Sequence, residues 1–160
     1  MSVPERLRDL LERNDVRYRV IEHAPAYTAQ EEAQAAHVPG RNWAKTVVVW
    51  MDDQPAIAVL PATRRLDLEQ FRESVGATHV RLADEAEFAA YYPDCEPGTM
   101  PPFGNLYGQR TFVDETLRED ETIAFHAGDH RTAVQISYAE FERLAEGIPG
   151  QFSDRASASS

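Results

Sequence analysis

The chain has 160 residues, of which 42% are hydrophobic, and a net charge of −11 at pH 7. This length suits one domain with a single core, and the longest apolar run, Val47 to Met51, is far shorter than the ~20 residues of a membrane-spanning helix. The negative charge argues against a general binder of DNA or anionic membranes. The chain opens with no basic segment followed by an apolar one, and its single cysteine, Cys95, fits a reducing compartment, so a cytoplasmic protein is expected.

The charge is uneven along the chain. Residues 1–81 carry eleven basic and twelve acidic residues, whereas residues 82–160 carry five and fifteen. A nearly neutral first half could still present one face to a polyanion, with Arg41, Lys45, Arg64 and Arg65 as its candidate contacts. The alternative is a solvated surface with no partner, which composition alone favours.

The first three elements are predicted before residue 40. Leucines at helical spacing predict a helix over 4–13, and alternating apolar residues predict a strand over 17–21. Thr28 and Glu31 have the spacing of a capping box, which opens an alanine-rich helix that ends near residue 37. The apolar runs 45–51 and 56–60 then predict an antiparallel hairpin.

The rest of the chain alternates short helices, strands and turns. Asp67 is expected to cap a helix that Gly76 closes. A Pro- and Gly-rich loop covers 97–104, and residues 151–160 are polar and small, so a disordered tail is expected there. The remaining predictions are strands at 79–82, 110–113, 122–127 and 133–136, and helices at 84–92 and 137–147.

This order lacks the regular strand–helix–strand spacing of a doubly wound parallel sheet. We therefore expect an α+β (mixed α/β) fold, with a largely antiparallel mixed sheet, curled or barrel-like, surrounded by helices. One domain over residues 1–150 is predicted, followed by the tail.

Lys45 is the only lysine, while the other fifteen basic residues are arginine. It precedes an apolar strand, where a compact ammonium differs from a guanidinium in hydration and pKa. Mutational drift from lysine to arginine would explain why other lysines are absent, but it does not explain why Lys45 is retained. We therefore interpret Lys45 as functional.

Metal and nucleophile motifs give little support to other chemistries. His126 and His130 are four residues apart but flank a turn, so they lack the helical geometry of a zinc motif, and no metal is expected. No Gly-x-Ser-x-Gly elbow, Cys-His pairing, Walker motif or dinucleotide motif occurs, and no cofactor is expected.

The loop Gly98–Gly104 contains two adjacent prolines between glycines. Proline fixes the backbone and glycine permits close approach, so the loop could hold a small polar group through its amides and carbonyls. The alternative is a stiff connector between a helix and a strand.

Several segments in this order resemble the YbaK-like family, the free-standing relatives of the prolyl-tRNA synthetase editing domain. They are the stretch 23–33, Ala44-Lys45-Thr46, Gly98-x-x-x-Pro102-Phe103-Gly104, Val113-Asp114 and Ala127-Gly128. The resemblance spans about residues 16–146. It implies a trans-editing aminoacyl-tRNA deacylase, which hydrolyses the ester of a mischarged tRNA.

The resemblance also implies roles for individual residues. Lys45, Gly98 and Pro102 would form the catalytic centre, with the lysine orienting the aminoacyl end while water attacks, helped by the terminal ribose hydroxyl and without a metal. Substrate contacts are expected from a further set: Tyr27, Thr28, Thr46, Phe103, Gly104, Gly128 and His130. His130 could equally be a surface turn residue.

The implied partners are the acceptor end of mischarged tRNA and, as an option, an aminoacyl-tRNA synthetase. The commonest target in the family is tRNA(Pro) carrying alanine or cysteine, but Thr46 stands where some alanine-specific relatives carry asparagine. Two alternatives remain open: a non-catalytic tRNA or synthetase adaptor, and a hydrolase of small aminoacyl esters.

Overall fold

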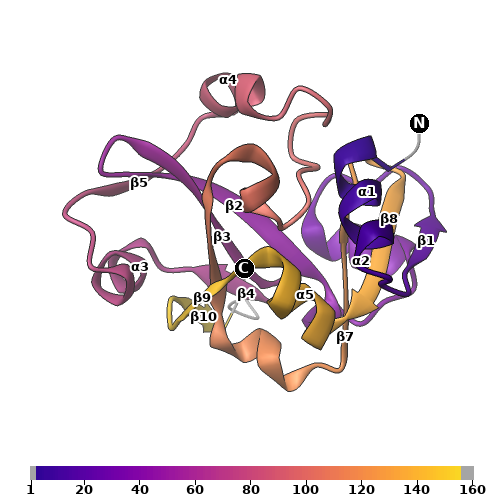
Figure 1. Ribbon diagram of the computed structural model, residues 1–160. Coiled ribbons are helices and arrows are strands. Elements are labelled where there is room, and N and C mark those ends of the chain that lie inside the picture. The colour runs from indigo at the N-terminus through magenta and orange to yellow at the C-terminus, as the bar shows by residue number, and fades with distance from the viewer. Residues whose placement is uncertain (1–2, 156–160) are drawn as a thin grey trace.

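The computed structural model describes residues 3–155, and Figure 1 shows their arrangement. The helices are α1 (Glu5–Arg13), α2 (Ala29–Ala35), α3 (Leu68–Val75), α4 (Glu85–Phe88) and α5 (Tyr138–Ala145), with 3-10 turns η1 (Gly40–Asn42), η2 (Ala89–Tyr91), η3 (Gly104–Tyr107) and η4 (Glu115–Glu119). The strands are β1 (Arg19–Glu22), β2 (Ala44–Met51), β3 (Gln54–Pro61), β4 (Arg64–Leu66), β5 (Val80–Leu82), β6 (Arg110–Asp114), β7 (Thr122–His126), β8 (Thr132–Ser137), β9 (Ile148–Gly150) and β10 (Ser153–Arg155). No helix among these residues is long and apolar enough to cross a membrane.

The strands form a five-stranded sheet β5-β2-β3-β6-β9, a three-stranded sheet β1-β8-β7 and the pair β10-β4. The larger sheet is mixed, because β2 pairs antiparallel with β3 and β5 while β3–β6 and β6–β9 are parallel. A bridge between Trp43 and Ala124 joins the two larger sheets at the start of β2. Among residues 3–155 no sheet closes on itself, so the barrel-like curl is not supported, whereas the mixed α/β class is confirmed.

Local sequence signals explain the elements nearest the site. The Thr28 hydroxyl accepts from the Glu31 amide and the Glu31 carboxylate accepts from the Thr28 amide, so the predicted capping box starts α2. The β2–β3 hairpin also forms as predicted. Its turn is only Asp52-Asp53, both with positive φ, as a two-residue turn with the twist of the strands requires.

The helices cover the sheets at different ends of the molecule. Figure 1 shows α1 and α2 beside the three-stranded sheet and α3 at the opposite end, next to β5. The main core contains Leu7 and Leu11 of α1 together with Phe103, Phe125 and Phe141. A second cluster lies on the other face of the five-stranded sheet, around Phe71 of α3.

The predicted disordered tail is wrong for its first five residues. Phe152 is fully buried and stacks edge-on with Phe71, while β10 pairs with β4. One aromatic side chain with a place in the core anchors this segment, although its neighbours are small and polar. Residues 156–160 of the predicted tail lie outside the described residues.

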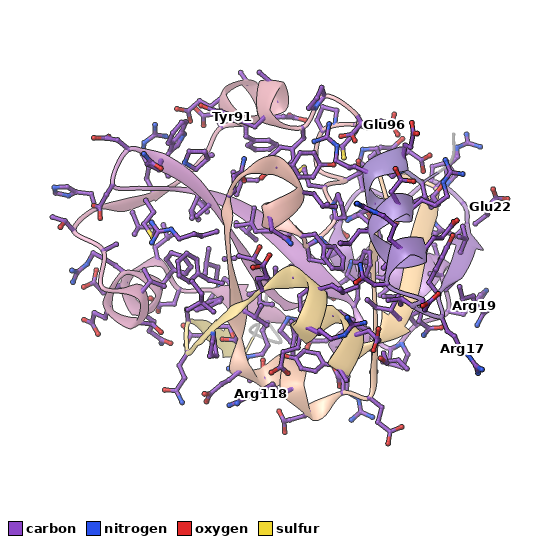
Figure 2. All side chains as sticks on the ribbon, viewed as in Figure 1. Arg17, Arg19, Glu22, Tyr91, Glu96 and Arg118 are labelled. Atoms are coloured by element: carbon purple, nitrogen blue, oxygen red, sulfur yellow. The ribbon has the colours of Figure 1, made fainter. Side chains whose placement is uncertain are left out.

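Charged side chains protect the open edge of the three-stranded sheet. Figure 2 shows Arg17, Arg19 and Glu22 projecting outward beside β1, which is an edge strand. Charges on an edge strand oppose pairing with another chain.

Candidate functional site

Lys45 lies on β2, opposite Leu60 of β3, and its side chain is partly buried. Burial lowers the pKa of its ammonium group, because a low-polarity environment disfavours the charged form. Within residues 3–155, no carboxylate forms an ion pair with it. The ammonium therefore keeps its hydrogen-bonding capacity for a ligand.

A cavity of about 570 Å³ opens beside this lysine. Its other walls come from the start of α2, including Thr28 and Gln30, and from Ala62 after β3. The capping box holds the α2 wall in place, and the hairpin register fixes the lysine. Thr28 and Lys45 therefore line the same cavity.

The Pro- and Gly-rich loop packs against the β7–β8 turn. The Glu96 amide donates to the Gly128 carbonyl at 2.8 Å, and the Gly128 amide donates to the Thr99 carbonyl at 3.0 Å. The Glu96 carboxylate accepts from the His130 amide at 3.1 Å. These bonds hold the loop and the turn as one rigid wall.

His130 joins this wall to the segment before α2. Its ring lies 4.6 Å from the ring of Tyr27, its Nδ1 lies 3.1 Å from the Ala26 carbonyl, and a Cβ on Gly98 would come 3.9 Å from its Cε1. Tyr27 is 70% exposed, so the group has an open side. The structure therefore brings Tyr27, Gly98 and His130 together, and Thr28, the residue after Tyr27, lines the cavity beside Lys45.

Other residues of the predicted site lie elsewhere. Phe103 is fully buried between Phe125 and Phe141, so it is a core residue and does not form a pocket wall. Gly104 is also buried, and its amide donates to Thr111 Oγ1 at 2.8 Å, which leaves it unavailable to a substrate. The motif around Phe103 thus anchors the loop in the core.

Three further members of the predicted site have little exposure toward the cavity. Pro102 is buried. Thr46 points to the face of β2 opposite Lys45, because successive strand side chains alternate, and its hydroxyl has no hydrogen-bond partner in the described part of the chain. A Cβ on Gly128 would lie 2.8 Å from Pro4 Cγ, so this glycine permits close packing of α1.

The three arginines do not form a uniformly basic face. Arg41 and Arg64 line a cavity of about 840 Å³ together with Glu119, Asp120 and Glu121. The Arg64 guanidinium also donates to the hydroxyl and carbonyl of Ser153, at 2.6 and 2.8 Å. Arg65 is exposed on β4. Acidic side chains thus offset the predicted positive surface.

A buried cluster around Glu32 of α2 was not predicted from the sequence. Glu32 is fully buried; its Oε2 lies 2.9 Å from His23 Nε2 and its Oε1 3.0 Å from His126 Nε2. His130 Nδ1 lies 3.8 Å from the same Oε1. The available signal was the position of Glu32 on the stripe formed by Ala29, Ala33 and Ala36, where a carboxylate is costly by several kcal/mol unless it is paired.

Comparison with known proteins now identifies the class. Residues 23–144 match the family model of the aminoacyl-tRNA editing domain, and the chain belongs to this family. The YbaK-like resemblance is thereby confirmed.

Two relatives illustrate the likeness. The chain is 24% identical over 144 residues to the prolyl-tRNA editing protein ProX of Acetoanaerobium sticklandii, covering 86% of this chain and 87% of that protein. It superposes with a TM-score of 0.81 and 21% identity on a candidate trans-editing enzyme for prolyl-tRNA synthetase, covering 96% of this chain and 99% of the other. A hypothetical protein of known structure gives a TM-score of 0.83 at 20% identity, covering 94% and 100%.

Proposed function

We propose that this protein is a trans-editing deacylase that hydrolyses the ester of mischarged tRNA, with tRNA(Pro) carrying a small wrong amino acid as its target. The observation that carries the proposal is the half-buried ammonium of Lys45 beside a cavity, in a chain of the editing-domain family. The relative named as a prolyl-tRNA editing protein supports the choice of tRNA.

In the proposed reaction, water attacks the carbonyl carbon of the aminoacyl ester. The tetrahedral intermediate collapses, the bond to the ribose oxygen breaks, and a free amino acid and the tRNA hydroxyl are released. The neighbouring ribose hydroxyl assists proton transfer. Lys45 donates hydrogen bonds that orient the aminoacyl end and stabilise negative charge on the carbonyl oxygen, where a desolvated cation acts strongly.

The wall formed by Tyr27, Gly98 and His130 would define the space for the amino acid side chain. Gly98 has a positive φ of 84° and no side chain, which leaves room beside the His130 ring. A pocket of this kind rejects larger amino acids by contact, whereas one methylene is worth only about 1–3 kcal/mol by binding alone. Editing as a second sieve fits this physical limit.

A deacylation panel tests the proposal. The purified protein is incubated with tRNAs charged with Ala, Cys, Ser, Thr or Pro, and remaining aminoacyl-tRNA is measured over time. Lys45→Ala and Lys45→Arg are assayed in parallel, with Arg8→Ala, the loss of an exposed cation on α1, as the control. We expect selective hydrolysis of one or two species, reduced in both Lys45 variants and retained in the control.

Two outcomes contradict the proposal. No hydrolysis by a folded wild-type protein favours the adaptor alternative, for which capture of a synthetase is the next experiment. Equal hydrolysis of aminoacyl esters without tRNA favours the small-ester alternative. A tRNA contact through the arginines is tested separately with Arg41→Ala, which should bind tRNA more weakly and with a smaller dependence on salt than the wild type.

A further inference from the structure

The cluster around Glu32 joins parts of the chain that are far apart in sequence. Glu32 comes from α2, His126 ends β7, His130 lies in the β7–β8 turn and His23 follows β1. The side chains of Glu32 and His23 are fully buried, and that of His126 is 8% exposed. The proposed deacylation gives no role to Glu32, His23 or His126, and His130 enters it only as part of the wall beside Tyr27.

The short contacts in this cluster do not have hydrogen-bond geometry. Both oxygens of Glu32, Nε2 of His23 and Nε2 of His126 are buried without a hydrogen-bond partner among residues 3–155. Nδ1 of His23 lies 2.7 Å from the Ala24 carbonyl, which assigns the ring proton to Nδ1 in the neutral ring. The lone pair on Nε2 then lies against a carboxylate oxygen, an arrangement that a cation would relieve.

We propose that Glu32, His126 and His130 bind a divalent transition metal ion, with Zn²⁺ as the preferred ion. One ligand atom from each residue lies within 4.8 Å of the other two. Glu32 Oε1 is 3.0 Å from His126 Nε2 and 3.8 Å from His130 Nδ1. These separations bracket the ~3.3 Å between ligands of a tetrahedral ion with bonds of about 2.0–2.1 Å.

The chemistry of the donors selects the metal. Two imidazoles and one carboxylate suit Zn²⁺, whereas Mg²⁺ and Ca²⁺ prefer oxygen ligands only. His23 lies beside the second carboxylate oxygen and would orient it, as outer partners do in metal centres. His130 Nδ1 would give up its contact with the Ala26 carbonyl, so its ring must shift or change tautomer on binding.

The proposed ion would link α2 to the β7–β8 turn. The start of α2 lines the cavity beside Lys45, and the turn carries His130, whose ring packs against that of Tyr27, so the ion would connect the cavity wall to this aromatic pair. The role assigned to the ion is structural, since it fixes these walls. This inference concerns binding by the chain itself and stands independently of the proposed deacylation.

Zinc binding is tested on the full-length protein after removal of metal with a chelator. Titration with ZnCl₂ is followed by calorimetry, and bound zinc is counted by mass spectrometry after gel filtration. We expect one equivalent per chain and a higher Tm with zinc. Glu32→Gln and His126→Asn should each weaken binding at least roughly 100-fold, since loss of even an outer partner costs 10–100-fold. His79→Asn, a change at an exposed histidine, is the control and should bind as wild type.

Cobalt provides a second readout that survives a folding defect in the buried variants. Co²⁺ bound to the wild type should show the intense visible absorption of low-coordinate cobalt, and His130→Asn should abolish it. His130 is partly exposed, so this variant is expected to fold. Binding of less than a tenth of an equivalent, or unchanged binding in Glu32→Gln and His126→Asn, overturns the proposal. Because these assays contain no tRNA, their failure is distinct from a failure of the deacylation panel.

Discussion

Replacement of Lys45 by methionine separates a binding role of the ammonium from a structural one. Methionine keeps an unbranched apolar side chain, so contacts along the lysine stem are retained while the charge is lost. The ammonium has no ion-pair partner within residues 3–155, so its removal breaks no buried pair. It is also partly desolvated, so its removal relieves an unfavourable burial.

The expected effects on activity and stability therefore have different sizes. A hydrogen bond to a charged group contributes about 1.5–3 kcal/mol, so kcat/KM for the edited aminoacyl-tRNA should fall roughly 10- to 150-fold. The free energy of unfolding should stay within about 0.5 kcal/mol of the wild type or rise, as for a surface substitution without a broken contact.

The assay combines single-turnover deacylation with urea unfolding of the same samples. Lys45→Arg is the matched variant that keeps the charge but changes its shape, and it should lose activity because a planar guanidinium cannot replace a compact ammonium. A Lys45→Met protein with wild-type kcat/KM refutes the role given to the ammonium. A loss of more than about 2 kcal/mol of stability, in parallel with activity, would instead make Lys45 a structural residue.

Three further predictions follow from burial. Phe103→Ala should lower the free energy of unfolding by about 3–5 kcal/mol in urea titrations, because its ring is fully buried against two other rings, and a loss below 1 kcal/mol would contradict a core position. Deacylation should begin to decline with rising pH before pH 10.5, the pKa of an ordinary lysine, because burial lowers the pKa of Lys45 and its charged form is lost earlier. A rate that stays constant up to pH 10.5, after correction for spontaneous hydrolysis, would contradict this prediction. Burial raises the pKa of the Cys95 thiol to about 11, so its alkylation by iodoacetamide at pH 8 should be far slower than that of free cysteine, and Cys95→Ala should keep full deacylation.

The sequence by itself determined the elements whose signals are local. The capping box at Thr28 and Glu31 and the cap at Asp67 act within one turn of their helices. The β2–β3 hairpin follows from two apolar runs with a turn between them. Lys45 also stood out without coordinates, because a single ammonium among fifteen guanidinium groups is visible in composition alone.

Only the tertiary structure decided which side chains meet. Glu32 joins His126 and His130 across about 100 residues of chain, a distance that no spacing rule covers. The placement of Phe103 in the core and the burial of Phe152 depend on packing against distant rings. Local hydrogen-bonding signals are encoded within a few residues, whereas burial and electrostatic environment depend on every element that packs around a side chain.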